Sequence, residues 1–251
     1  MKDRGGPERK GAPTVRIFED PAALARAAAQ EVLEAARATL SRQASFHMAL
    51  AGGSTPRAAY SALASSAKLD FERWHLWFGD ERCVAPDHPD SNFGMVRASG
   101  LLERVPSERV HRLRGEALDP GEEARRYSKE LVAALGSPPA LDLVLLGLGP
   151  DGHTASLFPG TEALAQSGWV TVGQAPKPPH TRLTLTFSAL RNAKRVTFLV
   201  AGPDKAEALG RVLSRDSSLP AHRLLDGPPL HWLVERAAVP PWLPGIRGCE
   251  G

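Results

Sequence analysis

The sequence Leu141–Gly160, LDLVLLGLGPDGHTASLFPG, joins an apolar run to a turn rich in glycine. The run at 141–146 is typical of a strand that is buried on both faces of a parallel sheet. The turn holds four glycines, an aspartate and a histidine. Because glycine allows positive φ and close approach of the backbone, we expect the turn to leave space for a ligand, with His153 facing that space.

Further apolar runs alternate with helical patterns on either side of this segment. Strands are predicted at 46–50, 74–78, 182–187, 195–202 and 230–234. Helices are predicted after Asp20-Pro21, from near Pro56, and over 91–102, 121–135 and 204–213. The alternation predicts an α/β fold with a mostly parallel sheet and helices on both faces. The proline-rich segment 173–180 lies between strands, and we expect it to form a surface loop over the site.

The composition is that of an ordinary globular protein. Hydrophobic residues make up 42% of the 251 residues and charged residues 24%, and the net charge is +3. This small positive excess suits a small anionic substrate. The arginines are scattered and form no basic stripe of the kind that binds nucleic acid, so we expect no nucleic-acid partner.

The ends of the chain and its cysteines bear on domain organisation and location. Residues 1–13 lack the apolar segment of a secretory signal, and no apolar run reaches the ~20 residues of a membrane span. Cys83 and Cys249 form no metal or redox motif, which favours two reduced thiols. We predict a cytoplasmic protein without a membrane partner, with one domain over 14–240, a disordered tail at 1–13 and a second tail at 241–251.

Polar residues follow the strand predicted at 46–50. In an open α/β sheet, ligands bind beyond the carboxyl ends of the strands. The candidate phosphate-binding residues here are Gly52, Gly53, Ser54 and Thr55. Their N–H groups, two hydroxyls and the positive end of a following helix could cradle a phosphate. The same segment also fits a tight turn in which Ser54 or Thr55 caps the helix.

Charged residues lie at the ends of other predicted strands. Asp80 and Arg82, in the turn Gly-Asp-Glu-Arg, could contact a substrate or form a surface ion pair worth under about 1 kcal/mol. Arg182 opens a strand and Lys205 begins a helix. Each of these two residues is either a solvated charge or an anchor for phosphate, Arg182 through parallel hydrogen bonds and Lys205 as a point charge.

His153 is the strongest candidate for chemistry. An imidazole can act as a general base near neutral pH, and Asp151 could orient it. A metal site would need more ligands than these two residues provide, so we expect no metal. The Gly-x-Ser-x-Gly motif of serine hydrolases is absent. The glycines of the turn match the spacing of a dinucleotide fingerprint, but Pro150 interrupts the backbone that would meet a pyrophosphate.

Several segments together resemble one enzyme family. They are LAGGSTPRAAY (50–60), WFGDERCVAPDHPDSNFGMV (77–96), LDLVLLGLGPDGHTASLFPG (141–160), TRLTLTFSALRNAKRVTFLVAG (181–202) and GPDKAEAL (202–209). In this order they resemble the glucosamine-6-phosphate isomerase/6-phosphogluconolactonase family, and within it the lactonases. These enzymes hydrolyse 6-phosphogluconolactone to 6-phosphogluconate in the oxidative pentose phosphate pathway. The resemblance implies a single Rossmann-like domain and, for ester hydrolysis, no cofactor.

The resemblance also implies a role for each matching residue. His153 would be the general base that activates water, with Asp151 beside it. The Gly-Gly-Ser-Thr segment would hold the phosphate. Contacts to the substrate are implied for Gly52, Gly53, Ser54, Thr55, Asp80, Arg82, Asn92, Arg182 and Lys205.

Two other functions share part of this pattern. Glucosamine-6-phosphate deaminases are similar, but an Asn-Glu-Pro run follows their histidine where this chain has Leu-Phe-Pro. Phe158 cannot exchange protons, which disfavours the amino-sugar reaction. A sugar-phosphate-sensing regulator would need a helix-turn-helix, and the residues before Phe18 are too few and too polar to form one. The predicted partner is therefore a phosphosugar lactone. A monomer is the simplest expectation, with self-pairing left open.

Overall fold

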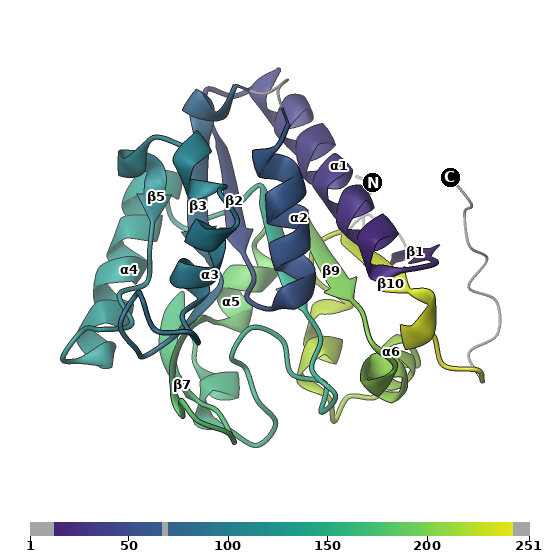
Figure 1. Ribbon diagram of the computed structural model, residues 1–251. Helices are drawn as coiled ribbons and strands as arrows, with labels where there is room; N and C mark the ends of the chain where they lie inside the picture. Colours follow the sequence, from purple (N-terminus) through teal and green to yellow (C-terminus); the bar gives the residue numbers. More distant parts are fainter. Residues whose placement is uncertain (1–12, 67–69, 243–251) are drawn as a thin grey trace, which may run out of the picture.

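A computed structural model describes residues 13–66 and 70–242 and shows a sheet flanked by helices (Figure 1). The tails predicted at 1–13 and 241–251, with Cys249, lie almost entirely outside these ranges. Cys83 lies inside them and has no disulfide partner there. In the same ranges, no helix is long and apolar enough to cross a membrane.

The main sheet confirms the predicted α/β class. Within the described residues it has seven parallel strands in the order β1-β10-β9-β6-β2-β3-β5. The strands are β1 (Thr14–Phe18), β2 (Phe46–Leu50), β3 (Trp74–Phe78), β5 (Val110–His111), β6 (Leu143–Gly147), β9 (Val196–Val200) and β10 (Leu230–Glu235). The edge strands β1 and β5 are the two that the sequence analysis did not predict.

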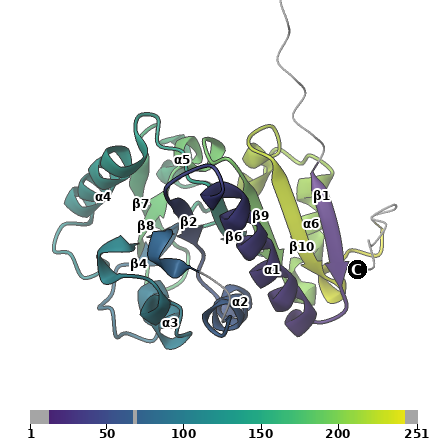
Figure 2. The same ribbon diagram turned by 90° about the horizontal axis from the view of Figure 1, so that it is seen from above.

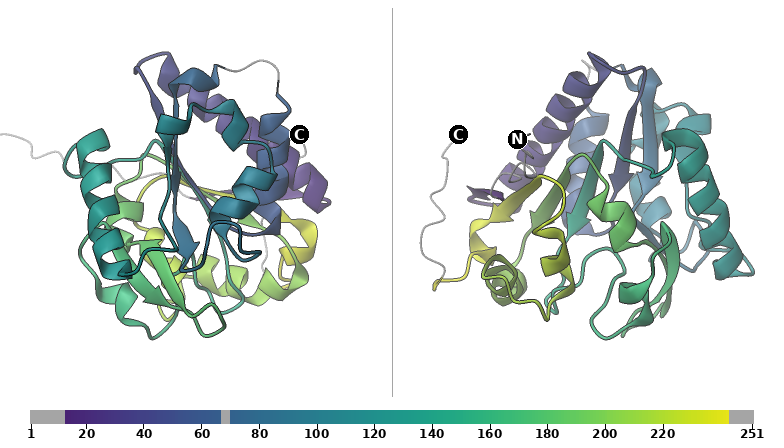
Figure 3. Two further views of the ribbon diagram at one scale, coloured as in Figure 1. Left: turned by 60° about the vertical axis from the view of Figure 1, so that its left-hand side comes forward. Right: turned by 180° about the vertical axis from the view of Figure 1, so that it is seen from behind.

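Helices cover both faces of this sheet. Their bounds are α1 (Pro21–Leu40), α2 (Ser54–Ala64), α3 (Asn92–Ala98), α4 (Pro120–Leu135), α5 (Phe187–Arg191) and α6 (Ala206–Leu213). Seen from above, α1, α2 and α3 lie on one side of the sheet and α4 and α5 on the other (Figure 2). The view from behind brings α5 and α6 to the front (Figure 3). The sheet is therefore buried between two helical layers, as a continuous apolar pattern in its strands requires.

Helix α1 begins where the sequence predicts. The Asp20 carboxylate accepts a hydrogen bond from the N–H of Ala23 at 2.7 Å, and Pro21 occupies the first turn. Leu24 and Val32, which lie on one face of the helix, are fully buried. The cap fixes the start of the helix, and the buried side chains fix the face that it turns to the sheet.

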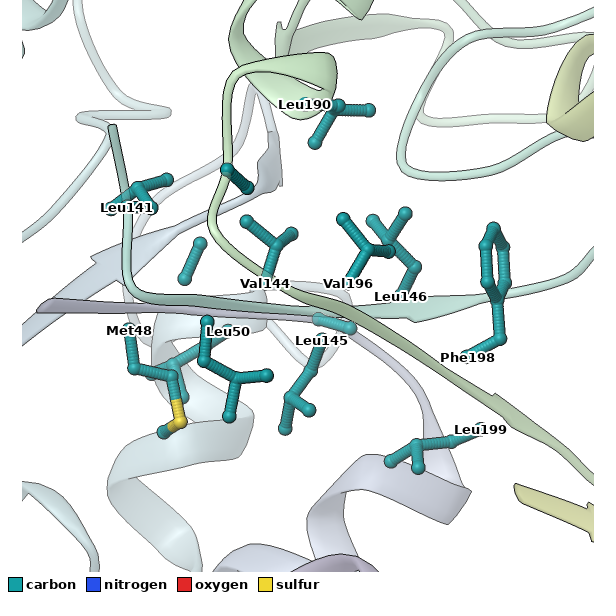
Figure 4. Packing of buried hydrophobic residues seen from close by; sticks show 14 of the residues in the cluster. Met48, Leu50, Leu141, Val144, Leu145, Leu146, Leu190, Val196, Phe198 and Leu199 are labelled. Atoms are coloured by element: carbon teal, nitrogen blue, oxygen red, sulfur yellow. The ribbon is translucent and has the colours of Figure 1, made fainter. Parts of the chain in front are cut away.

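The core follows the alternation of side chains along the strands. In the close view, Met48, Leu50, Leu145 and Leu199 point to one face of the sheet, and Val144, Leu146, Val196 and Phe198 point to the other, toward Leu190 of α5 (Figure 4). All of these side chains are buried. Burying each such side chain contributes about 1.5–3 kcal/mol, so the strands that carry the site are firmly held.

A second, antiparallel sheet corrects two predictions. Its order is β4-β8-β7, with β4 at Asp80–Arg82, β8 at Thr181–Leu185 and β7 at Val170–Gln174. Asp80 and Arg82 were expected in a turn but form a strand, and the strand expected at 182–187 pairs in this sheet instead of the parallel one. A short apolar strand has the same pattern in either sheet, so the pattern alone does not distinguish them.

Gly79 is the point at which the chain leaves the parallel sheet for the antiparallel one. Its N–H donates to the carbonyl of Leu50 in β2 at 2.9 Å, and its own carbonyl accepts from the N–H of Leu185 in β8 at 2.8 Å. One residue thus bonds to both sheets. As a result, β4 and β8 lie at the carboxyl ends of the parallel strands.

Three histidines, one each from β2, β3 and β5, stack beside one another on the main sheet. The rings of His47 and His75 lie 4.3 Å apart, and Trp77 stacks on His111 at 3.8 Å. The Nδ1 atom of His47 accepts from the Trp77 indole at 3.2 Å, and His111 contacts Glu130 at 2.6 Å. These contacts make the three histidines part of the packing between the strands.

The histidine stack predicts acid sensitivity of folding. Burial, reinforced by neighbouring positive charge, lowers the pKa of His47 to about 3 and that of His75 to about 4. Because these pKa values are lower in the folded state than in the unfolded state, the stabilisation is present above pH ~6.5 and is lost as the pH falls. The lowered pKa of His47 alone should reduce the free energy of unfolding by about 2 kcal/mol as the pH falls from 7 to 5. Urea titrations at the two pH values measure this.

A matched pair of variants isolates the cause of that pH dependence. His47→Gln should lower stability at pH 7 but flatten its decline toward pH 5. Leu131→Ala, a buried change in α4 without a titratable group, should lower stability by the same amount at both pH values. An unchanged slope in His47→Gln would contradict the assignment.

Candidate functional site

Most of the predicted site residues meet in a cleft with two adjoining lobes beyond the carboxyl ends of the parallel strands, whereas Gly53, Ser54, Thr55 and Asn92 line neither lobe. We call the smaller cavity, of about 190 Å³, the glycine lobe; Ala51, Gly52, Gly147, Gly149 and Lys205 line it. We call the larger cavity, of about 450 Å³, the arginine lobe; Asp151, Ser156, Phe158, Pro176, Lys177 and Arg182 line it. The residues shared by both lobes are Asp80, Arg82, His153 and Ala155. His153 therefore stands where the lobes join.

His153 and Asp151 form a close pair. Asp151 Oδ1 accepts from His153 Nδ1 at 2.5 Å and from the backbone N–H of His153 at 3.2 Å. Burial alone would raise the pKa of Asp151, but the hydrogen bonds and charge of His153 outweigh it, so the pKa of this carboxyl is lowered. A carboxylate at Nδ1 favours the tautomer with its proton there, which leaves Nε2 as the acceptor nitrogen.

The glycine turn makes room for the imidazole. A Cβ on Gly149 would lie 2.0 Å from His153 Nδ1 and 2.7 Å from Asp151 Oδ1. Only a residue without a side chain allows this approach. Phe158 also contacts the ring, with centroids 4.3 Å apart. The imidazole is thus held in one orientation by a carboxylate, a bare backbone and an aromatic ring.

Two side chains hold the Asp80 carboxylate, and only one of them, Ser156, lines a lobe of the cleft. Its Oδ2 accepts from Ser156 Oγ at 2.7 Å, and its Oδ1 accepts from Asn92 Nδ2 at 3.1 Å. Asn92 is buried, and neither lobe includes it. It lies behind Asp80, a place suited to positioning rather than to contact. Ser156, which the sequence analysis did not select, ends the Gly-His-Thr-Ala-Ser segment, and that proximity was its only signal.

The alternation of side chains in β4 separates Glu81 from the cleft. Asp80 and Arg82 point to the lobes, whereas Glu81 points the other way and accepts the N–H groups of Asn92 and Phe93, each at 2.7 Å. Burial raises the pKa of Glu81 despite these bonds. Glu81 therefore anchors the start of α3.

The Gly-Gly-Ser-Thr segment enters the site mainly through Gly52. A Cβ on Gly52 would lie 2.0 Å from Asn92 Oδ1, so the loop packs directly against the side chain that also holds Asp80. Gly53, with φ of 108°, is the N-cap residue of α2, and no side chain caps that helix. The helix begins at Ser54, two residues before the predicted start. The alternative in which Ser54 or Thr55 caps α2 is therefore wrong.

The basic residues differ in how far they are already paired. Lys205 contacts Asp204 at 2.7 Å, and Arg82 donates to the carbonyl of Asp90 at 2.6 Å. Arg182 is 7% exposed, and its Nε and one terminal nitrogen have no hydrogen-bond partner in the described part of the chain. Burial, followed by the charge of Arg82, lowers the pKa of Arg182. A buried guanidinium without partners can donate hydrogen bonds to an anionic or carbonyl oxygen of a ligand.

The proline-rich loop borders the cleft, although Gly173 and Gln174, the first two residues of the predicted loop 173–180, end strand β7. Residues 175–180 connect β7 to β8, and the N–H of Ala175 bonds to the carbonyl of His180 at 2.7 Å across the loop. Pro176 and Lys177 line the arginine lobe. Sequence analysis did not select Lys177, because a lysine between prolines carries no signal until the hairpin is folded. Within the described residues, no group of three His, Cys, Asp or Glu side chains could hold a metal ion.

The parallel sheet, its two helical layers and the strand-end cleft define an α/β protein of the Rossmann-like class. A model of the family described as glucosamine-6-phosphate isomerases/6-phosphogluconolactonase matches residues 19–232. The chain belongs to this family, as the sequence segments indicated.

Named relatives and solved structures agree with this assignment. The chain is 39% identical over 235 residues to a 6-phosphogluconolactonase of Nostoc sp., which covers 90% of this chain and 96% of the relative. A 6-phosphogluconolactonase structure from Trypanosoma cruzi has a TM-score of 0.83 at 28% identity, covering 90% of this chain and 95% of the other. A monomeric glucosamine-6-phosphate deaminase has a TM-score of 0.76 at 25% identity, covering 90% and 98%.

Proposed function

We propose that this chain hydrolyses 6-phospho-D-glucono-1,5-lactone to 6-phosphogluconate, a step of the oxidative pentose phosphate pathway. The observation that carries the proposal is the Asp151–His153 pair at the junction of two lobes that are lined with basic side chains. The names of the relatives, at up to 42% identity, support the same reaction.

The proposed chemistry uses His153 as a general base. Its Nε2 takes a proton from a water molecule as the water oxygen bonds to the lactone carbonyl carbon. The bond from that carbon to the ring oxygen then breaks, and the imidazolium returns the proton to the ring oxygen as it leaves. Asp151 stabilises the imidazolium between these steps. Water and lactone become the hydroxy acid, so the proposed reaction needs no redox partner.

The lobes suggest how the substrate lies. We place the phosphate in the glycine lobe, whose small volume, lining by Ala51 and Gly52 and the Lys205 side chain suit a compact dianion. Arg182 and Arg82 then face the carbonyl end, where negative charge develops during attack. Stabilising that charge is usually the largest single contribution to such catalysis.

The amino-sugar reaction is the competing function, because a deaminase shares the fold. Phe158 argues against it. Its ring contacts His153, at the place where the resemblance to deaminases would require a glutamate, and a phenyl ring can neither donate nor accept a proton.

The test is hydrolysis of freshly generated 6-phosphogluconolactone, with spontaneous hydrolysis subtracted and glucosamine-6-phosphate assayed in parallel. Fast lactone opening without ammonia release is the expected result. Ammonia release without lactonase activity would favour the deaminase. Binding of sugar phosphates without turnover of either compound would favour a sensor.

A further inference from the structure

The chain contains two tyrosines, and their surroundings are alike. Tyr60 in α2 and Tyr127 in α4 are both fully buried. Their helices lie on opposite sides of the parallel sheet (Figure 2). A buried phenol normally requires a hydrogen-bond partner, so the partners of each hydroxyl show which part of the fold it holds.

Tyr60 bonds to the backbone at the end of β2. Its hydroxyl accepts from the N–H of Ala51 at 2.8 Å and lies 3.0 Å from the carbonyl of the same residue, to which it donates. Ala51 lines the glycine lobe and directly precedes Gly52. The hydroxyl therefore replaces the ladder partners that Ala51 lacks beyond the end of the strand.

Tyr127 does the same at the end of β3. Its hydroxyl accepts from the N–H of Phe78 at 2.7 Å and lies within donating distance of the carbonyls of Phe78, at 3.2 Å, and His111, at 3.0 Å. Phe78 lies two residues before Asp80, which lines both lobes.

The two contacts act on one structural unit. Leu50 and Phe78 are register partners in the sheet, and the N–H of Gly79 bonds to the carbonyl of Leu50 at 2.9 Å. The ends of β2 and β3 are thus bonded to each other, and each end is also hydrogen-bonded to a tyrosine hydroxyl, from opposite faces of the sheet.

We propose that Tyr60 and Tyr127 are positioning residues. They hold Asp80 and the loop of residues 51–53, here called the Gly52 loop, in place relative to His153. Neither side chain lines a lobe, so each acts through the backbone. The kinetic part of this inference rests on the proposed function. Its structural part, which concerns the backbone at Ala51 and Phe78, does not.

Phenylalanine variants test the proposal because they remove one oxygen and keep the ring. Tyr60→Phe and Tyr127→Phe are compared with Thr197→Val, which removes a buried hydroxyl bonded to Glu31 at 2.6 Å near the amino end of β9. Lactonase kinetics are measured well below each variant's melting temperature. The measurement is paired with amide hydrogen exchange of peptides covering 46–55 and 74–82.

In both tyrosine variants, kcat/KM should fall roughly five- to fifty-fold, the range expected when a buried backbone group loses its partner. Tyr60→Phe should act chiefly on KM, because the Gly52 loop faces the proposed phosphate position. Exchange should accelerate at 46–55 in Tyr60→Phe and at 74–82 in Tyr127→Phe. Thr197→Val should lose stability without either change.

Two results would overturn the proposal. Tyrosine variants whose kcat/KM matches that of Thr197→Val would show that the hydroxyls serve stability alone. Unchanged exchange at both strand ends would show that the backbone does not depend on them. If the wild-type chain has no lactonase activity, the proposed function fails, while the exchange experiment still decides the positioning role.

Discussion

Replacing His153 with alanine is expected to lower kcat for lactone hydrolysis by roughly 100- to 10,000-fold, the usual contribution of a general base. KM should change little, because the proposed phosphate contacts lie in the glycine lobe. The loss should occur without unfolding, since His153 lies in the cleft wall rather than in the apolar core.

Steady-state kinetics with freshly generated lactone measure this effect. The control is His222→Ala in the segment Pro220–Leu224, which lines neither lobe and should retain wild-type turnover. Far-ultraviolet circular dichroism and melting temperature verify that each variant is folded. Wild-type-like kcat in folded His153→Ala would exclude this residue as the base.

Asp151→Asn is expected to cost roughly 100- to 10,000-fold in kcat, by analogy with triads in which a carboxylate orients a catalytic histidine. An amide keeps the shape of the carboxylate but removes its charge, and it can present its NH2 group to Nδ1. The proton on the imidazole would then shift to Nε2, the nitrogen that must accept a proton from water. The imidazolium would also lose its stabilising partner.

A double-mutant cycle distinguishes this role from simple loss of a contact. In a chain that already carries His153→Ala, the Asp151→Asn change should have almost no further effect on kcat, because residues that act as a unit are not additive. Fully additive losses would mean that Asp151 acts on the substrate independently of His153.

Local signals in the sequence predict much of the parallel framework. Asp20-Pro21 specifies the start of α1, and the continuous apolar runs identify the central strands. The Gly-Pro-Asp-Gly-His segment identifies the Asp151–His153 pair, because residues two apart in a turn lie close together. In each of these cases the interacting residues are close along the chain.

Features that depend on distant pairing could not be predicted in the same way. Arg182 lies beside Arg82 because β8 pairs with β4, and an apolar strand does not reveal which sheet it joins. Asn92 was expected among the substrate contacts, and its buried place behind Asp80 depends on where α3 begins. The approach of Ser156 to Asp80 joins segments 76 residues apart.

The position of Gly79 between the two sheets has a consequence for how the walls of the cleft are built. One wall of the cleft, with Arg182 and the loop at 175–180, stands on a hairpin outside the parallel sheet, whereas His153 and Gly52 lie in loops that follow β6 and β2 of that sheet. The shape and charge of that wall can therefore vary through the turn between β7 and β8 without disturbing the strands that lead to His153 and Gly52. The cleft is thus built from two scaffolds, and one of them can change while the other is retained.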